Sequence, residues 1–197
     1  MITSIFPINI LVKDFDMQDS WTQDIIGIAK AVFANDQAEK GSESATGNNR
    51  VIFFTEENLS TFSAIAELRQ MFADSFYELA SSYPNNKLTK DILEERIKNN
   101  SGYLNFMKKG EHQSVHTHDP EVFAFGIFYL TDIDNHQFGG ELVLHNPSFS
   151  GAWHFNHGHT YSVPTKKNRM VICPNTIWHE VTPYSGESDR MAIVVNL

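Results

Sequence analysis

The histidines of this chain are confined to one part of the sequence. All nine lie between His112 and His179, and none lies before them. Imidazole changes its charge near neutral pH and is the commonest protein ligand of metals. The clustering therefore favours a metal site or an acid–base site in the C-terminal half of the chain. The alternative is that polar surface residues have accumulated there.

The sharpest pattern is His116-Thr117-His118, inside a predicted strand from Gln113 to His118. Side chains alternate along a strand, so two imidazoles at positions i and i+2 project from one face and converge on one ion. A third ligand from a distant strand would complete a facial set. Such a set leaves coordination positions open for substrates, as in non-haem Fe(II) oxygenases. The alternative is a pair of solvated histidines near a turn.

His179 is the candidate for the distant ligand, because it lies on a short apolar strand near the C-terminus. A core or rim histidine is the alternative. Arg190 opens the last predicted strand, whose other residues are mostly apolar. Burying an arginine without a partner is unfavourable, and its planar fork suits a carboxylate. Arg190 therefore indicates an anionic ligand, and a salt bridge to Glu187 or Asp189 is the alternative.

The elements that position these residues change in character near Gly102. Before it, apolar residues recur with a helical period. The expected elements there are a helix from Ser20, its N-cap, to about Lys40, a loop over Gly41–Asn49, a strand over Val51–Phe54, a helix through Leu59–Leu79, and a helix over Lys90–Lys98 capped by Thr89.

After Gly102 the apolar period is two, with frequent turn signals. The predicted strands are Tyr103–Lys108, Gln113–His118, Val122–Leu130, Glu141–His145, Thr160–Val163, Arg169–Cys173, Ile177–Val181 and Arg190–Asn196. Eight short strands with no helical pattern between them predict a jelly roll, also called a double-stranded β-helix. We expect a mainly β single domain over residues 1–197, in which a helical part (1–101) packs on the jelly-roll core (102–197).

Composition limits the class of protein. The 197 residues are 41% hydrophobic and 12% aromatic, enough for a folded core, and the net charge of −9 argues against binding of nucleic acid. No apolar run reaches the ~20 residues needed to cross a membrane. The start of the chain lacks the basic region of a signal peptide. The single cysteine, Cys173, excludes an internal disulfide and fits core packing better than catalysis. These features predict a cytoplasmic protein without a membrane partner.

In their order along the chain, these motifs resemble those of the Fe(II)/2-oxoglutarate-dependent oxygenases, especially the prolyl-hydroxylase-like branch. The motifs are Gly110 with His116 six residues later, the strand Phe125–Leu130, Gly139-Gly140-Glu141-Leu142, His179-Glu180-Val181-Thr182-Pro183 and Arg190. The opening Ile5–Ile8 and the closing strand also resemble bacterial and phage proteins of that superfamily. The resemblance covers roughly Tyr103 to Leu197.

The resemblance implies an enzyme that binds Fe(II), 2-oxoglutarate and dioxygen and hydroxylates a substrate, more often a peptide or protein side chain. It makes His116 and His179 metal ligands. It assigns 2-oxoglutarate to Tyr129 and Arg190, with Arg190 pairing with the distal carboxylate. It makes Gly139-Gly140 the turn that enters a strand.

The family motif is H-x-D, and here His118 occupies the aspartate position. The nearby carboxylate, Asp119, is one residue out of register and would face the other side if the strand continued. A turn at Asp119-Pro120 could bring it inward. We favour a three-histidine set of His116, His118 and His179 over one that includes Asp119.

Two other functions stay open. A cupin-like three-histidine dioxygenase that works without 2-oxoglutarate accounts for His118 but leaves Tyr129 and Arg190 unexplained. A non-catalytic jelly-roll binding module would make the histidines incidental. The aromatic segment His145–His159 is interpreted as a lid beside the site, with a second metal site as the alternative.

Overall fold

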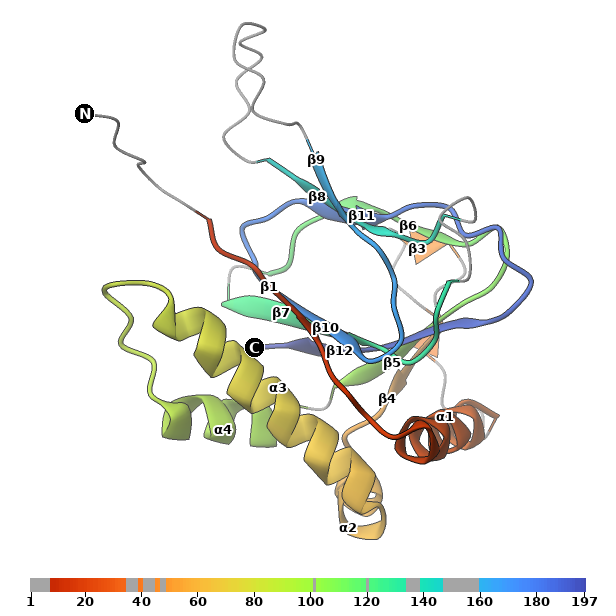
Figure 1. The fold of residues 1–197 in the computed structure, drawn as a ribbon, viewed down its shortest axis with the longest axis horizontal. Coiled ribbons are helices and arrows are strands. Elements are labelled where there is room, and N and C mark those ends of the chain that lie inside the picture. The colour runs from red at the N-terminus through yellow and green to blue at the C-terminus, as the bar shows by residue number, and fades with distance from the viewer. Residues whose placement is uncertain are drawn as a thin grey trace, which may run out of the picture.

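The computed structural model describes residues 8–34, 39–40, 45–46, 49–100, 102–119, 121–133, 139–146 and 160–197. These residues form two antiparallel sheets that face each other, and helices cover the outer side of the larger sheet (Figure 1). The larger sheet contains, in spatial order, β1 (Leu11–Asp14), β10 (Arg169–Pro174), β7 (Ala124–Tyr129), β12 (Arg190–Asn196), β5 (Tyr103–Met107), β4 (Asn49–Ile52) and β2 (Glu39–Lys40). The smaller sheet contains β3 (Ala45–Thr46), β6 (His112–His116), β11 (His179–Val181), β8 (Leu142–His145) and β9 (Thr160–Val163).

The eight strands predicted after Gly102 are all present, each within two residues of its predicted bounds. The strand predicted over Val51–Phe54 is β4, shifted two residues towards the N-terminus. Strands β1, β2 and β3 were not predicted. They are short and pair through main-chain hydrogen bonds, which leave no hydrophobic alternation in the sequence.

Among the described residues, four helices precede the jelly-roll strands: α1 (Asp19–Ala34), α2 (Glu56–Thr61), α3 (Ser63–Ser81) and α4 (Lys90–Lys98). The prediction for α4 is confirmed, and the Thr89 hydroxyl accepts a hydrogen bond from the Ile92 amide at 3.3 Å. The long helix predicted through Leu59–Leu79 is two helices. They are separated at Phe62, whose backbone is extended.

The N-terminal boundaries differ most from the prediction. Helix α1 begins at Asp19, so Ser20 lies in its first turn and is not the N-cap. Lys40, predicted to end that helix, belongs to β2, which pairs with β4. The predicted loop over Gly41–Asn49 contains β3, which pairs with β6. Polar residues can therefore extend both sheets wherever a strand edge offers unpaired main-chain groups.

Two hydrophobic cores lie on opposite faces of the larger sheet. Helix α3 packs its apolar stripe, which includes Phe72 and Phe76, against the outer face, where Phe128 of β7 points. Phe125 and Tyr129 of the same strand point the other way, into the core between the sheets. Alternation along β7 and β12 therefore decides which side chains can reach a site between the sheets.

None of the described helices is long and apolar enough to cross a membrane.

Candidate functional site

Three histidines converge between the sheets. His116 ends β6 and His179 begins β11, and the two are paired directly in register. Directly opposed residues of antiparallel strands project from the same face, so their rings lie 4.2 Å apart. The ring of His118 lies 5.0 Å from that of His179 and 5.5 Å from that of His116. One nitrogen of each ring lies within 4.8 Å of the others.

Main-chain carbonyls orient two of these rings. The Nδ1 atom of His116 donates to the Ser114 carbonyl at 2.8 Å, and that of His179 donates to the Ile177 carbonyl at 3.0 Å. A carbonyl oxygen can only accept, so the proton of each ring is on Nδ1, and Nε2 is the nitrogen whose lone pair faces the cluster and can act as an acceptor or a metal ligand. The Nε2 atoms of His118 and His179 are 3.2 Å apart. Metal-binding histidines characteristically donate their other ring N–H to such a partner.

The aromatic floor of this cluster is Phe125. Its ring stacks on His179 at 4.2 Å and on His118 at 4.7 Å between centroids. His179 is only 3% exposed. Burial, with a smaller contribution from nearby His116, lowers the pKa of His179 to about 3. The ring is therefore neutral at physiological pH, which is the form that a metal requires.

His118 and Asp119 lie beyond the end of β6. The strand ends at His116, two residues earlier than predicted, so alternation along a strand is not what brings His118 to the cluster. The segment that follows the strand places it there. Among the described residues the cluster does not include Asp119, whose carboxylate accepts a hydrogen bond from the Glu121 amide at 2.9 Å.

Arg190 is 2% exposed and lies on the inner face at the start of β12. Its Nε atom donates to the Gly140 carbonyl at 2.8 Å, and one terminal nitrogen contacts the Met107 sulfur at 3.3 Å. No described carboxylate pairs with it, and Glu187 forms an ion pair with Lys109 instead. Burial away from a counter-charge lowers the pKa of Arg190. The salt bridge considered as an alternative is therefore not observed in the described part of the chain.

Gly140 and its neighbour Gly139 form the turn before β8. Both have positive φ angles, 65° at Gly139 and 75° at Gly140. A side chain at Gly139 would collide with the main-chain oxygen of Pro183. These two glycines therefore allow the turn that presents the Gly140 carbonyl to Arg190.

The Tyr129 hydroxyl is fully buried and finds no partner at hydrogen-bonding geometry among the described residues, although Thr165 and Arg190 are its neighbours. The guanidinium carbon of Arg190 lies 5.2 Å from the Tyr129 ring centre. Burial raises the pKa of Tyr129, so the hydroxyl keeps its proton and can donate a hydrogen bond.

Comparison with protein families shows which family the chain belongs to. Residues 99–197 match the model of the 2OG-Fe(II) oxygenase superfamily. The chain belongs to this superfamily. Membership confirms the resemblance inferred from the motifs. It also confirms the predicted class, an oxidoreductase that uses Fe(II) and 2-oxoglutarate. A comparison of the sequence with curated proteins finds no match.

Solved structures share the fold of this oxygenase at low sequence identity. A prolyl-4-hydroxylase from Pseudomonas putida has a TM-score of 0.71 and 10% identity, over 96% of this chain and 91% of its own. A Trichoplax adhaerens prolyl hydroxylase, in complex with a hypoxia-inducible-factor peptide fragment, has a TM-score of 0.65 and 14% identity, over 95% of this chain and 82% of its own. A viral collagen prolyl hydroxylase from Paramecium bursaria Chlorella virus-1, in complex with 2-oxoglutarate, has a TM-score of 0.60 and 10% identity, over 95% of this chain and 94% of its own. These likenesses confirm the double-stranded β-helix.

The residues fit both groups that the superfamily uses. The Nε2 lone pairs of His116 and His179, with the His118 ring beside them, offer nitrogen ligands to a metal. The unpartnered Tyr129 hydroxyl and the terminal nitrogens of Arg190 offer donors to a carboxylate. The cavity between them has a volume of about 20 Å³, which is room for roughly one water molecule. A cosubstrate would therefore have to displace lining side chains.

Phe125, Gln113 and Asn105 also line the cavity but were not among the site residues that the sequence predicts. The Nε2 atom of Gln113 donates to the Nε2 atom of His116 at 3.0 Å, so a metal there would replace this hydrogen bond. Asn105 is a polar residue on a buried strand, and that is the one signal that could have identified it.

The predicted lid falls mainly on residues 147–159, which lie outside the described part of the chain. Cys173 is buried in the core between the sheets, as predicted.

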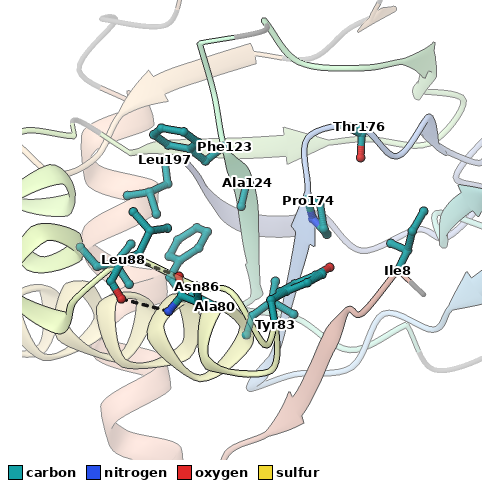
Figure 2. A pocket seen from close by; sticks show the side chains of 13 residues that line it. Ile8, Ala80, Tyr83, Asn86, Leu88, Phe123, Ala124, Pro174, Thr176 and Leu197 are labelled. Carbon is teal, nitrogen blue, oxygen red and sulfur yellow. Dashed lines mark hydrogen bonds between the residues drawn. The ribbon is translucent and has the colours of Figure 1, made fainter. Parts of the chain in front are cut away.

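A larger cavity of about 370 Å³ lies on the other side of the larger sheet, beside α3 and α4 (Figure 2). Ala124 lines it, whereas the next residue, Phe125, faces the histidines. Its walls are mostly apolar, and Figure 2 shows Asn86 hydrogen-bonded to the main chain of Leu88. None of the described residues that line it is a histidine or has a charged side chain, whereas the three clustered histidines and Arg190 lie between the sheets.

Proposed function

We propose that this chain is a 2-oxoglutarate-dependent hydroxylase in which His116, His118 and His179 hold Fe(II), and Arg190 and Tyr129 hold 2-oxoglutarate. The observation that carries the proposal is the buried Arg190, which has no described counter-charge and lies beside an unpartnered hydroxyl. A buried cation without a carboxylate is unfavourable unless a ligand supplies one.

Arg190 and Tyr129 would bind the distal carboxylate of 2-oxoglutarate. The Gly140 carbonyl holds Nε of Arg190, so the side chain stays anchored while its terminal nitrogens are available. The contact of one of them with the Met107 sulfur is weak and easily exchanged for a carboxylate oxygen. The Tyr129 hydroxyl would donate to the same carboxylate.

Fe(II) and 2-oxoglutarate would supply the oxidation chemistry when they are bound. One oxygen atom of O2 enters a C–H bond of the substrate, and the other enters succinate as 2-oxoglutarate loses CO2. The protein contributes orientation and exclusion of water. The three imidazoles would hold the metal at the histidine end of the cavity, and the Phe125 ring stacks on the rings of His118 and His179.

The substrate we propose is a peptide or protein side chain. Support comes from the fold shared with the prolyl hydroxylase in complex with a peptide fragment.

Succinate formation tests the proposal. Protein given Fe(II), 2-oxoglutarate and O2 should form succinate, more rapidly with proline-containing peptides, and His179→Ala and Arg190→Ala should abolish it. Arg169→Ala is the matched control. Arg169 also begins a strand of the larger sheet, but its side chain pairs with Asp14 at the protein surface. If Arg190→Ala forms succinate at the parent rate, the assignment of Arg190 is wrong.

A further inference from the structure

Asn105 is buried in the cavity wall with an unmet hydrogen-bonding group. It lies on β5, is 4% exposed, and lines the cavity that contains the three histidines and Arg190. Its Oδ1 atom is buried and has no hydrogen-bond partner in the described part of the chain. A buried amide left in this state destabilises a fold, so such groups often serve a ligand.

The register of the larger sheet places Asn105 in one row with Tyr129. Ala192 of β12 is paired directly with Asn105 of β5 on one side and with Tyr129 of β7 on the other. Directly opposed residues share a face, so all three side chains point between the sheets. Ala192, which has the smallest side chain of the row, leaves space between two side chains that each carry an unpartnered polar atom.

Arg190 lies in the next row on the same face. It is paired with Met107, two residues along from Asn105, and a two-residue step on a strand is roughly 7 Å. In the other direction, the row of Tyr103, Val194 and Ile127 separates Asn105 from Phe125 below the histidines. Asn105 therefore lies at the end of the cavity where Arg190 is, in the same row of the sheet as Tyr129.

We propose that Asn105 is a third 2-oxoglutarate-binding residue, whose carboxamide donates a hydrogen bond to the carboxylate held by Arg190 and Tyr129. This inference rests on the proposed function. A half-turn of the side-chain amide exchanges its NH2 group with Oδ1, so the donor can face the carboxylate. The three side chains would then surround one carboxylate above Ala192.

The test compares Asn105→Leu and Asn105→Ala with the parent. Leucine keeps the size of the side chain and removes the amide. The Kd for 2-oxoglutarate, measured anaerobically on the Fe(II)-loaded protein, should rise roughly 3- to 10-fold, the loss of about one hydrogen bond. The Kd for Fe(II) should not change. Asn105→Asp places a negative charge beside the carboxylate, so it should weaken 2-oxoglutarate binding more than Asn105→Leu or Asn105→Ala does.

Thermal unfolding separates a binding role from a structural one. Without 2-oxoglutarate, Asn105→Leu should have a Tm equal to or above that of the parent, because it removes an unpaired buried group. The rise in Tm on adding 2-oxoglutarate should be smaller than in the parent. Ser75→Ala is the matched control, since Ser75 also has a buried, unpartnered oxygen but lies on α3, in the core outside the larger sheet. It should bind 2-oxoglutarate like the parent.

The outcomes distinguish this inference from the proposed function. If the parent binds 2-oxoglutarate and both apolar variants bind it equally well, Asn105 is not a binding residue and the proposed function stands. If the Tm of both apolar variants falls without a change in Kd, the role of Asn105 is structural. If the iron-loaded parent does not respond to 2-oxoglutarate, the inference and the proposed function fail together.

Discussion

His118 determines the charge of the proposed metal centre. It occupies the position at which the family motif has aspartate, so in the proposed centre three imidazoles would replace the usual two imidazoles and one carboxylate. The metal centre would then carry one more positive charge than the usual one. A dianionic cosubstrate has to supply more of the neutralising charge, which makes Arg190 and its neighbours more important for holding that cosubstrate in place.

Removing the His118 side chain should weaken Fe(II) binding far more than removing that of Asp119. Altering a group that merely hydrogen-bonds a metal ligand costs about 10–100-fold in affinity, so losing the ligand should exceed that. We therefore expect His118→Ala to lower the affinity for Fe(II) by at least about 100-fold. Asp119→Ala should be close to the parent, because the Asp119 carboxylate caps the Glu121 amide. Anaerobic titration with Fe(II) measures both.

His118→Asp is the companion variant, and it should retain iron because it restores the usual ligand set of the family. If Asp119→Ala loses more iron than His118→Ala does, the segment after β6 delivers the carboxylate and not the imidazole.

Arg190 should contribute most of the affinity for 2-oxoglutarate. A two-pronged, charge-assisted pair in a largely dry pocket is worth roughly 2–4 kcal/mol, so Arg190→Ala should weaken binding on the order of 30- to 1000-fold. Arg190→Lys should recover only part of this, because an ammonium group lacks the fork. Tyr129→Phe should lose about 1 kcal/mol, the value of one hydrogen bond. Equilibrium titration of each iron-loaded variant measures the Kd, and equal affinities in parent and Arg190→Ala would refute the assignment.

Pairing between strands brings together residues that are far apart in the chain. The register of β6 with β11 sets His116 against His179, and the register of β12 with β7 sets Ala192 against Tyr129. Strand β1 extends the same sheet through β10, where Asp14 is paired directly with Arg169. The side chains of this last pair also meet, with Arg169 Nε donating to Asp14 Oδ1 at 2.7 Å.

The attachment of β1 should depend on pH through Asp14. Hydrogen bonds from Arg169 are the main cause that lowers the pKa of Asp14 to about 2 from its usual 3.8. A lowered pKa in the folded state stabilises the protein above about pH 4, and this stabilisation is lost as the pH falls through about 2. The Asp14 side chain is 41% exposed, so solvent screening limits the effect to less than about 1 kcal/mol.

Asp14→Asn should therefore lower the free energy of unfolding at pH 7 by less than about 1 kcal/mol, and by less still at pH 2.5. Urea denaturation at the two pH values measures this. The control is Glu78→Gln, which removes one exposed contact to Lys13 of β1 and should change little at either pH. A loss for Asp14→Asn that is equal at both pH values would show that its charge is not responsible.

At the scale of the whole molecule, the strands and candidate site residues of the C-terminal half could be predicted from the sequence. The alternation of apolar and polar residues indicates the strands, and the histidines and Arg190 indicate the site. Arg190 on a strand of otherwise apolar residues indicated a buried ligand contact, and the structure places it on the inner face. Each strand after Gly102 was close to its predicted bounds because turn residues mark the strand ends.

Features set by partner strands could not be predicted. Strand β6 ends at His116 because its pairing with β11 ends at His179, and no residue of β6 itself signals this. A polar residue on a buried strand was the one signal for Asn105, but which face of β5 is the inner one became evident only from its register with β12. The strands β1 to β3 depend on edges formed by distant segments.

The most direct test is anaerobic titration of the Fe(II)-loaded protein with 2-oxoglutarate, followed by the metal-to-ligand charge-transfer absorption band. The account predicts that iron binds at one equivalent, and that the band then rises and saturates as 2-oxoglutarate fills one site. Iron binding without any band at millimolar 2-oxoglutarate would contradict it and favour a three-histidine dioxygenase that works without this cosubstrate.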